Sequence, residues 1–154
     1  MAQRLILTVL VAGMLAGCAA VSESRLNPFN WFGQSREVEA IAITPDSLID
    51  GRPLLDQVVS LRVDATPGGA VVHAVGLPPQ QGWFDGELIA SNRGRAVDGV
   101  LEYRFYARPP FRPTRLSTQR SREIVVAVAL SNQALRGVRE IRVVAARNAR
   151  AVRR

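Results

Sequence analysis

The sequence contains very little cysteine and histidine and no lysine. Its 154 residues include one cysteine, Cys18, and one histidine, His73, and all 20 basic residues are arginine. A single cysteine cannot form an intramolecular disulfide, which excludes the disulfide-rich class of small secreted domains. Zinc sites in proteins draw on several cysteine and histidine ligands, so the composition also argues against a zinc site.

The sequence also lacks the motifs of common catalytic sites. It has no G-x-S-x-G nucleophile elbow and no glycine-rich phosphate loop after an expected strand. A hydrolase triad needs a base beside a nucleophile and an orienting carboxylate, which leaves His73 with a distant serine as the candidate. Val71 and Val75 share the expected face of His73, and this favours a structural histidine at or near the core. We therefore predict a protein that is not an enzyme and that has no cofactor.

Two carboxylates lie close together in one expected strand. Asp85 and Glu87 are two residues apart, so alternation places them on the same face. Such a pair could supply half of a calcium site or a glycosidase-like pair of acids. A solvated strand face is the simpler interpretation, and we expect no metal site here.

The first 17 residues have the layout of an export signal. Arg4 precedes an apolar run from Leu5 to Ala16, and small residues come before Cys18. The run is shorter than the about 20 residues that a membrane-spanning helix needs, which favours cleavage over a retained span. An incidental thiol beside an ordinary signal peptide or a hydrophobic N-terminal helix is the alternative.

The tetrapeptide LAGC at residues 15–18 resembles the lipobox of bacterial lipoproteins at all four positions. This resemblance implies cleavage between Gly17 and Cys18, acylation of Cys18 and attachment to a lipid bilayer. Two or three acyl chains would hold the protein firmly, because each buried methylene contributes about 0.8 kcal/mol. In that family Asp after the cysteine is typical of retention in the inner membrane, so Ala19 favours the periplasmic face of the outer membrane.

Residues 18–38 form the expected flexible tether, which is rich in Ser, Asn, Gly, Glu and Arg. Its apolar cluster consists of Phe29, Trp31 and Phe32, in a setting of Pro, Asn and Gly that suits neither a helix nor a strand. Aromatic side chains favour the headgroup layer of a bilayer, so these three are candidate contacts with the membrane or a partner. Docking back onto the folded domain is the alternative.

Residues 39–147 show the period of two that is typical of strands. Six short segments have this pattern, and Pro, Gly and polar residues separate them. The six are residues 58–65, 70–77, 83–91, 100–107, 123–131 and 138–146. EAIAIT at residues 39–44 is a candidate seventh strand, and TPGG at residues 66–69 is expected to form a turn.

Alternation within these segments predicts which side chains face the core. Val59 and Ala65 are expected on the inner face of the first segment and Phe84 on that of the third. Glu140 is expected to face solvent. Because no amphipathic helix separates the segments, the pattern indicates an all-β domain of antiparallel strands, a β-sandwich similar to the immunoglobulin and fibronectin type III folds. A small closed barrel is the alternative.

Arginine is concentrated in two parts of the chain, whose net charge is +7. One is the segment 108–122, which contains no acidic residue. Its arginines are Arg108, Arg112, Arg115, Arg120 and Arg122. The other part includes residues 148–154, which are expected to form a basic tail. We expect an anionic envelope lipid or glycolipid, or an envelope protein, as the partner, and no nucleic acid, which a lipoprotein outside the cytoplasm rarely meets. A solvated positive face is the alternative.

Much of the chain after the tether resembles a group of small bacterial proteins. TPGGAVVHAVGLPPQQGWFDGELI and REIRVVAARNARAVRR are similar to small, uncharacterised envelope lipoproteins of alphaproteobacteria. The resemblance implies an envelope location and a β-sandwich, but no established activity. We therefore predict a lipid-anchored, non-enzymatic binding or structural module in the periplasm or at the outer membrane. A periplasmic hydrolase or other enzyme that uses His73 is the alternative function.

Overall fold

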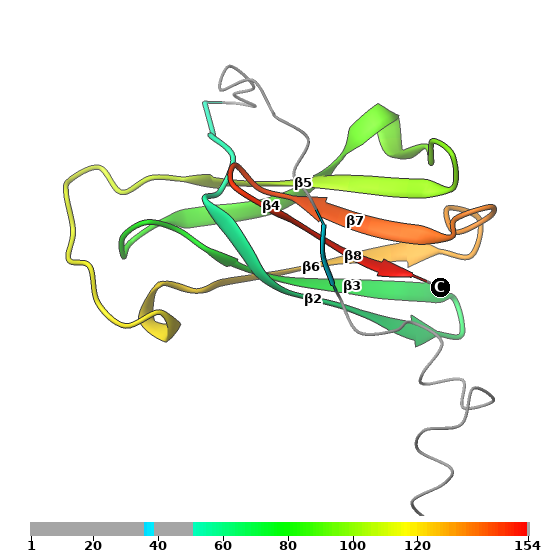
Figure 1. Cartoon of the computed structure of the whole chain (residues 1–154), viewed down its shortest axis with the longest axis horizontal. Helices are drawn as coiled ribbons and strands as arrows, with labels where there is room; N and C mark the ends of the chain where they lie inside the picture. The colour runs from blue at the N-terminus through cyan, green and yellow to red at the C-terminus, as the bar shows by residue number, and fades with distance from the viewer. Residues whose placement is uncertain (1–35, 39–50, 154) are drawn as a thin grey trace, which may run out of the picture. The chain divides into compact units, whose positions relative to one another are not determined.

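The computed structural model describes residues 36–38 and 51–153. In these residues eight strands form two sheets, one in the order β1-β8-β7-β5-β4 and one in the order β2-β3-β6 (Figure 1). The strands are β1 (Arg36–Val38), β2 (Gln57–Thr66), β3 (Gly69–Leu77), β4 (Phe84–Ala90), β5 (Val100–Arg108), β6 (Ile124–Ser131), β7 (Glu140–Val144) and β8 (Ala149–Arg153). The connections contain two short 3-10 helices, η2 (Ser91–Gly94) and η3 (Arg120–Arg122). Over these ranges no helix is long and apolar enough to cross a membrane.

The prediction of an all-β domain is confirmed, and the six predicted segments correspond to β2 through β7. The TPGG segment forms the predicted turn, because Thr66 pairs with Gly69 across a loop of Pro67 and Gly68. β3, which is apolar on both faces apart from His73, lies at the centre of its sheet. The candidate strand at residues 39–44 lies outside the described residues.

The two sheets bury one shared core between them. Leu61 and Val72 come from the three-stranded sheet, and Phe105, Ile141 and Val143 come from the five-stranded sheet. These side chains are at most 3% exposed. Burying a side chain of this kind stabilises a fold by about 1.5–3 kcal/mol. The shared core therefore provides the main force that holds the sheets together.

Gly76 is packed tightly against side chains of this core. A Cβ at this position would lie 1.9 Å from Leu55 Cδ2 and 2.7 Å from Phe105 Cε1. Leu55 is fully buried, and its N–H donates to the Phe105 carbonyl at 2.8 Å. Its own carbonyl accepts from the Ala146 N–H, also at 2.8 Å. Leu55 thus joins β3, β5 and the turn between β7 and β8.

The topology differs from the expected antiparallel arrangement at one pair of strands. β5 and β7 are parallel, with Val100 opposite Glu140. The chain passes through β6 in the other sheet between them, and this crossover returns β7 in the direction of β5. The described strands form two separate sheets and not a single closed barrel. The immunoglobulin or fibronectin type III topology is not confirmed.

Both ends of the described region add strands that were expected as tether or tail. Residues 149–153 form β8, antiparallel to β7, and residues 36–38 form β1, antiparallel to β8. The prediction of a basic tail over residues 148–154 is therefore wrong. The sequence ARAVR is a buried strand despite its two arginines, because Ala149, Ala151 and Val152 are each only 1% exposed.

Register shifts change the faces of several predicted core residues. In β2 the register shifts after Val58, which is fully buried, whereas Val59 is half-buried. In β4 the register shifts after Phe84, which is 40% exposed, and Asp85 adopts a left-handed φ of 53°. Ala65 is exposed at the hairpin end of β2. The predictions that Val59 and Phe84 face the core are therefore wrong, because a bulge inverts the alternation at each of them. Ala65 keeps the face of Leu61 and Val63, and the prediction that it is a core residue is wrong because it lies at the hairpin end of the strand.

The contact at Gly76 predicts a large effect of a single methyl group. Gly76→Ala should lower the free energy of unfolding by about 1–3 kcal/mol, because Leu55 and Phe105 must move to admit the Cβ. Gly68→Ala is the matched control, since no heavy atom lies within 4 Å of a Cβ at Gly68. It should change stability by less than about 0.5 kcal/mol. Denaturant unfolding of both variants checks this, and equal midpoints would contradict it.

Candidate functional site

The connection between β5 and β6, residues 109–123, lies at one end of the two sheets and is called the β5–β6 loop below (yellow in Figure 1). Residues 111–121 are all exposed. Three prolines, Pro109, Pro110 and Pro113, disfavour a regular strand there. The loop is fastened to the segment before β4, because Thr114 Oγ1 donates to the Gln81 carbonyl at 2.5 Å.

The five arginines predicted as anion contacts fall into two groups. Arg108 Nε donates to Asp85 Oδ2 at 2.9 Å. Arg122 Nη1 donates to the carbonyls of Pro78 and Pro79 at 2.8 and 2.9 Å. These two arginines fasten the ends of the loop to the domain. The other three are exposed, and their side chains make no hydrogen bond or ion pair with the residues that the structure describes: Arg112, Arg115 and Arg120.

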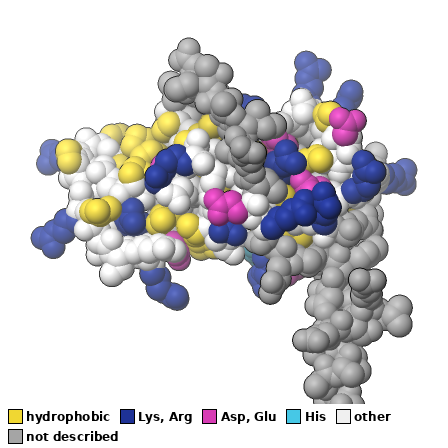
Figure 2. Space-filling model, in the orientation of Figure 1, with side chains coloured by type: hydrophobic (Ala, Val, Ile, Leu, Met, Phe, Trp, Pro, Cys, Tyr) yellow, Lys and Arg dark blue, Asp and Glu magenta, His cyan; other side chains and the backbone are white. Residues whose placement is uncertain are grey.

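The β5–β6 loop also exposes large apolar side chains. Phe111 is 95% exposed and Leu116 is 72% exposed. The Phe111 ring lies against the Phe84 ring, with 5.7 Å between centroids and 43° between planes. In Figure 2, arginine and hydrophobic side chains are interspersed at this end of the domain. Apolar side chains beside unpaired guanidinium groups are typical of surfaces that meet a membrane interface.

Asp85 and Glu87 are half-exposed on β4, and both pair with Arg52. Arg52 Nη2 lies 2.7 Å from Glu87 Oε2, and its Nη1 lies 3.6 Å from Asp85 Oδ2. The Arg52 side chain is only 8% exposed, so these carboxylates neutralise a nearly buried charge. They therefore do more than cover a solvated face. Within the described ranges, no group of three or more His, Cys, Asp or Glu residues could hold a metal ion.

His73 lies on the outer face of β3 and not in the core. The inner face of that strand carries Ala70, Val72 and Ala74, which are buried. The His73 side chain is 33% exposed, and its Nε2 lies 3.2 Å from Asp64 Oδ2. This gives a histidine and a carboxylate of the kind found in hydrolase triads. No hydroxyl or thiol group in the described part of the chain hydrogen-bonds to His73.

The charge cluster around Glu140 was not predicted. Glu140 faces away from the core, as expected, but it is only 6% exposed. Arginines from three strands surround it: Arg142 Nη2 at 2.8 Å, Arg153 Nε at 3.2 Å and Arg36 Nη2 at 3.2 Å. Burial alone would raise the pKa of Glu140, but the hydrogen bonds from Arg142 and Arg153 and the charge of Arg36 lower this pKa below its ordinary value.

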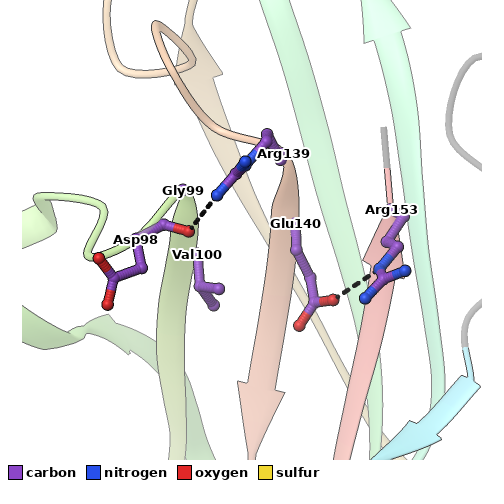
Figure 3. A pocket seen from close by; sticks show the side chains of 6 residues that line it. All are labelled: Asp98, Gly99, Val100, Arg139, Glu140 and Arg153. Carbon is purple, nitrogen blue, oxygen red and sulfur yellow. Dashed lines mark hydrogen bonds and ion pairs between the residues drawn. The ribbon is translucent and has the colours of Figure 1, made fainter.

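A pocket of about 510 Å³ lies beside Glu140 (Figure 3). It is lined by Asp98, Gly99, Val100, Arg139, Glu140 and Arg153. Arg139 Nη2 donates to the Asp98 carbonyl at 2.9 Å. Its guanidinium lies over Gly99, where a Cβ would be 2.6 Å from Arg139 Nε. Arg139, Glu140 and Arg153 in this wall are thus already paired with one another or with the backbone, and the pair of Glu140 with Arg153 fastens β7 and β8 together.

The remaining predicted site residues lie outside the described residues. They are the cleavage and lipidation residues Gly17 and Cys18 and the aromatic cluster Phe29, Trp31 and Phe32. Their roles stay predictions. The structure therefore brings together two candidate features, the β5–β6 loop and the Glu140 cluster, and only the loop presents unpaired charge to solvent.

Comparison with known proteins provides no family for this chain. No protein-family model matches it, and neither curated proteins nor solved structures give a significant match. The functional argument therefore depends on the residues themselves.

The Glu140 cluster predicts a pH-dependent contribution to stability. The pKa of Glu140 is lowered in the folded state, so its contribution is complete above the unfolded value of about 4.3 and is lost as pH falls through the folded value. At neutral pH, Glu140→Gln should lower the free energy of unfolding by roughly 1–3 kcal/mol, because three guanidinium groups lose their carboxylate.

Unfolding measured between acidic and neutral pH checks this prediction. The difference in the free energy of unfolding between wild type and Glu140→Gln should become smaller as the pH falls and Glu140 is protonated. Glu37→Gln is the control, because the Glu37 side chain is 60% exposed on the edge strand β1 and should contribute less than about 0.5 kcal/mol. A difference in the free energy of unfolding that is the same at all pH values would contradict the pH-dependent role of Glu140.

Proposed function

We propose that the protein is a lipid-anchored, non-enzymatic binding module of the bacterial cell envelope, and that its β5–β6 loop contacts an anionic surface. One observation carries this proposal. The loop presents Arg112, Arg115 and Arg120 without described partners, together with the exposed side chains of Phe111 and Leu116. Charge and apolar surface are thus combined in one exposed segment that the domain holds at both ends.

The chemistry of these side chains favours phosphate groups at a lipid surface. A guanidinium group stays charged and can donate two parallel hydrogen bonds to a phosphate. Each basic residue near an anionic membrane contributes about 1 kcal/mol, and apolar side chains add to this by entering the interface. Anionic phospholipids and phosphorylated glycolipids share this chemistry. An acidic envelope protein is the alternative ligand.

The anchor is supported by the LAGC segment that ends at Cys18. Acylation there would keep the domain close to the bilayer, where a modest affinity of the loop is sufficient. Ala19 favours the outer membrane over the inner membrane. The aromatic cluster of Phe29, Trp31 and Phe32 follows within the tether and is proposed to contact the same interface.

We also propose that the two-sheet layout is a variant of the immunoglobulin and fibronectin type III architectures. Counted from β2, the three-stranded sheet contains the first, second and fifth strands, which correspond to A, B and E of the four-stranded ABED sheet in the immunoglobulin fold. The other sheet departs from that fold, because β7 pairs with β5 and not with β4. The layers support the relationship, and the strand order in the larger sheet counts against it.

The loop proposal predicts salt-sensitive binding to anionic vesicles. A soluble form that begins at Ala19 should sediment with vesicles of anionic phospholipid or with lipopolysaccharide at low ionic strength, and less so at high ionic strength. Replacing Arg112, Arg115 and Arg120 with Gln should reduce the affinity by roughly a hundredfold, given about 1 kcal/mol for each residue.

The matched control changes the same charge at other loops. Arg93, Arg95 and Arg136 are exposed, and their side chains have no described partner either. Their triple Gln variant should retain most of the binding. Equal losses in the two variants would show that net charge alone is responsible, and binding that is indifferent to salt would reject an electrostatic role.

The anchor predicts that Cys18→Ser abolishes acylation. Wild-type cells should incorporate labelled fatty acid into the protein, and the variant should not. Cys18 is the one cysteine in the chain, and serine does not supply the thiol that is acylated. Labelling and membrane fractionation check this. A wild type that takes up no fatty acid would reject the lipoprotein assignment.

A further inference from the structure

We propose that two copies of this chain associate through β6, whose free edge pairs antiparallel with β6 of the second copy. The two three-stranded sheets would then form one continuous sheet across a two-fold axis. This inference is independent of the proposed anchor and of the β5–β6 loop, because it depends on a different surface.

β6 has the properties of an edge that can accept another strand. Among the described strands it lies at the edge of its sheet, with β3 as its neighbour. Its sequence, IVVAVALS, contains no charged residue and no proline. Its register with β3 runs without a shift from Ile124 opposite Gly76 to Ser131 opposite Gly69. A long, regular, uncharged edge strand of this kind is a template for strand addition.

The register identifies the backbone groups that face outward. The Asn132 N–H donates to the Gly68 carbonyl at 2.9 Å, which continues the ladder by one residue beyond Ser131. Hydrogen-bonded and non-hydrogen-bonded pairs alternate in an antiparallel ladder. The N–H and C=O groups of Val125, Ala127 and Ala129 are therefore directed away from β3, toward the free edge.

The other edge of this sheet is protected. β2 has a register shift after Val58, and the Val58 carbonyl accepts hydrogen bonds from Arg150 Nε at 3.0 Å and Asn148 Nδ2 at 3.1 Å. The charged side chains of Arg62 and Asp64 lie further along β2. These are the usual devices that prevent an edge from pairing with another chain.

The edges of the five-stranded sheet are protected as well. β4 carries a register shift and the charged residues Asp85 and Glu87, and β1 has only three residues. In the part of the chain that the structure describes, β6 is therefore the edge without any such device.

The core is also incompletely covered at β6. On its inner face Ile124, Val126 and Val128 are only half-buried, whereas Leu61 and Val63 of β2 are at most 5% exposed. On its outer face Val125 is 68% exposed. A strand added beside β6 would remove part of this apolar surface from water, which favours association.

A second copy of the chain fits this edge by charge. The protein carries a net charge of +7, so most faces of two copies repel each other. β6 has no charged residue, and Arg122, just before it, is held by the carbonyls of Pro78 and Pro79. A two-fold axis at Ala127 places Val125 opposite Ala129 and Ile124 opposite Leu130 of the second copy, so that uncharged side chains meet along β6.

Disulfide trapping tests this arrangement in the full chain. Ala127→Cys is combined with Cys18→Ser, so that the introduced thiol is the only one and acylation does not affect the outcome. Paired residues at the axis would have Cα atoms about 5.5 Å apart, which a disulfide can bridge. Mild oxidation of the detergent-purified protein should give a disulfide-linked dimer.

Ser60→Cys in the same background is the matched control, because Ser60 is exposed on the protected strand β2. It should remain a monomer on a non-reducing gel. Val125→Lys, tested without an introduced cysteine, should shift the sedimentation profile from dimer to monomer and still unfold cooperatively, with its midpoint lowered only by the loss of association. Trapping of Ala127→Cys at the level of Ser60→Cys, a monomeric wild type, or trapping in cells to a different protein would each overturn the proposal.

Discussion

The contact of Leu55 and Phe105 with the bare backbone of Gly76 is the constraint on which the rest of the domain depends. It sets the distance between the two sheets at the end where β3 and β5 finish. Because Leu55 also bonds the backbone of β5 and of the turn after β7, the same contact directs the chain into β2. The segment after β3 and the β5–β6 loop then leave the sheets side by side, where Gln81 and Thr114 connect them. The apolar contact thus fixes the strand ends from which the arginine-bearing loop leaves, and hydrogen bonds such as that of Thr114 then hold the loop in place.

Period-two alternation was sufficient to find β2 through β7, because each of these strands has one face in the core. It failed for features that the alternation of apolar and polar residues does not reveal. β8 carries two arginines in five residues, Arg150 and Arg153, and its small residues Ala149 and Ala151 do not resemble a core sequence although they are buried. The bulges at Val58 and Asp85 leave no mark in the composition, yet they invert the faces of the residues around them. The parallel pairing of β5 with β7 depends on long-range packing that local patterns do not report.

The candidate site shows the same division. The β5–β6 loop could be predicted, because arginines in a segment without acidic residues must find their partners elsewhere. The sequence does not predict which of these arginines are paired, because their partners are far away along the chain. Arg108 bonds to Asp85 at a separation of 23 residues, and Arg122 bonds to Pro78 at a separation of 44. Glu140 looked like an ordinary outward-facing residue, and its arginines come from strands that only the fold brings together. Composition therefore locates a charged surface, and the fold decides which charges remain available.

The three-residue strand β1 has a mechanical consequence. Among the described strands β1 comes first in the chain and pairs with β8, so tension applied at Arg36 would act on this strand first. The ion pair between Arg36 and Glu140 links β1 directly to β7, an inner strand of the five-stranded sheet, and would transmit part of this force to it. The described core cluster takes no residue from β1, so this strand can peel away while the core stays closed. A force applied at this end would therefore detach β1 before it could unfold the rest of the domain.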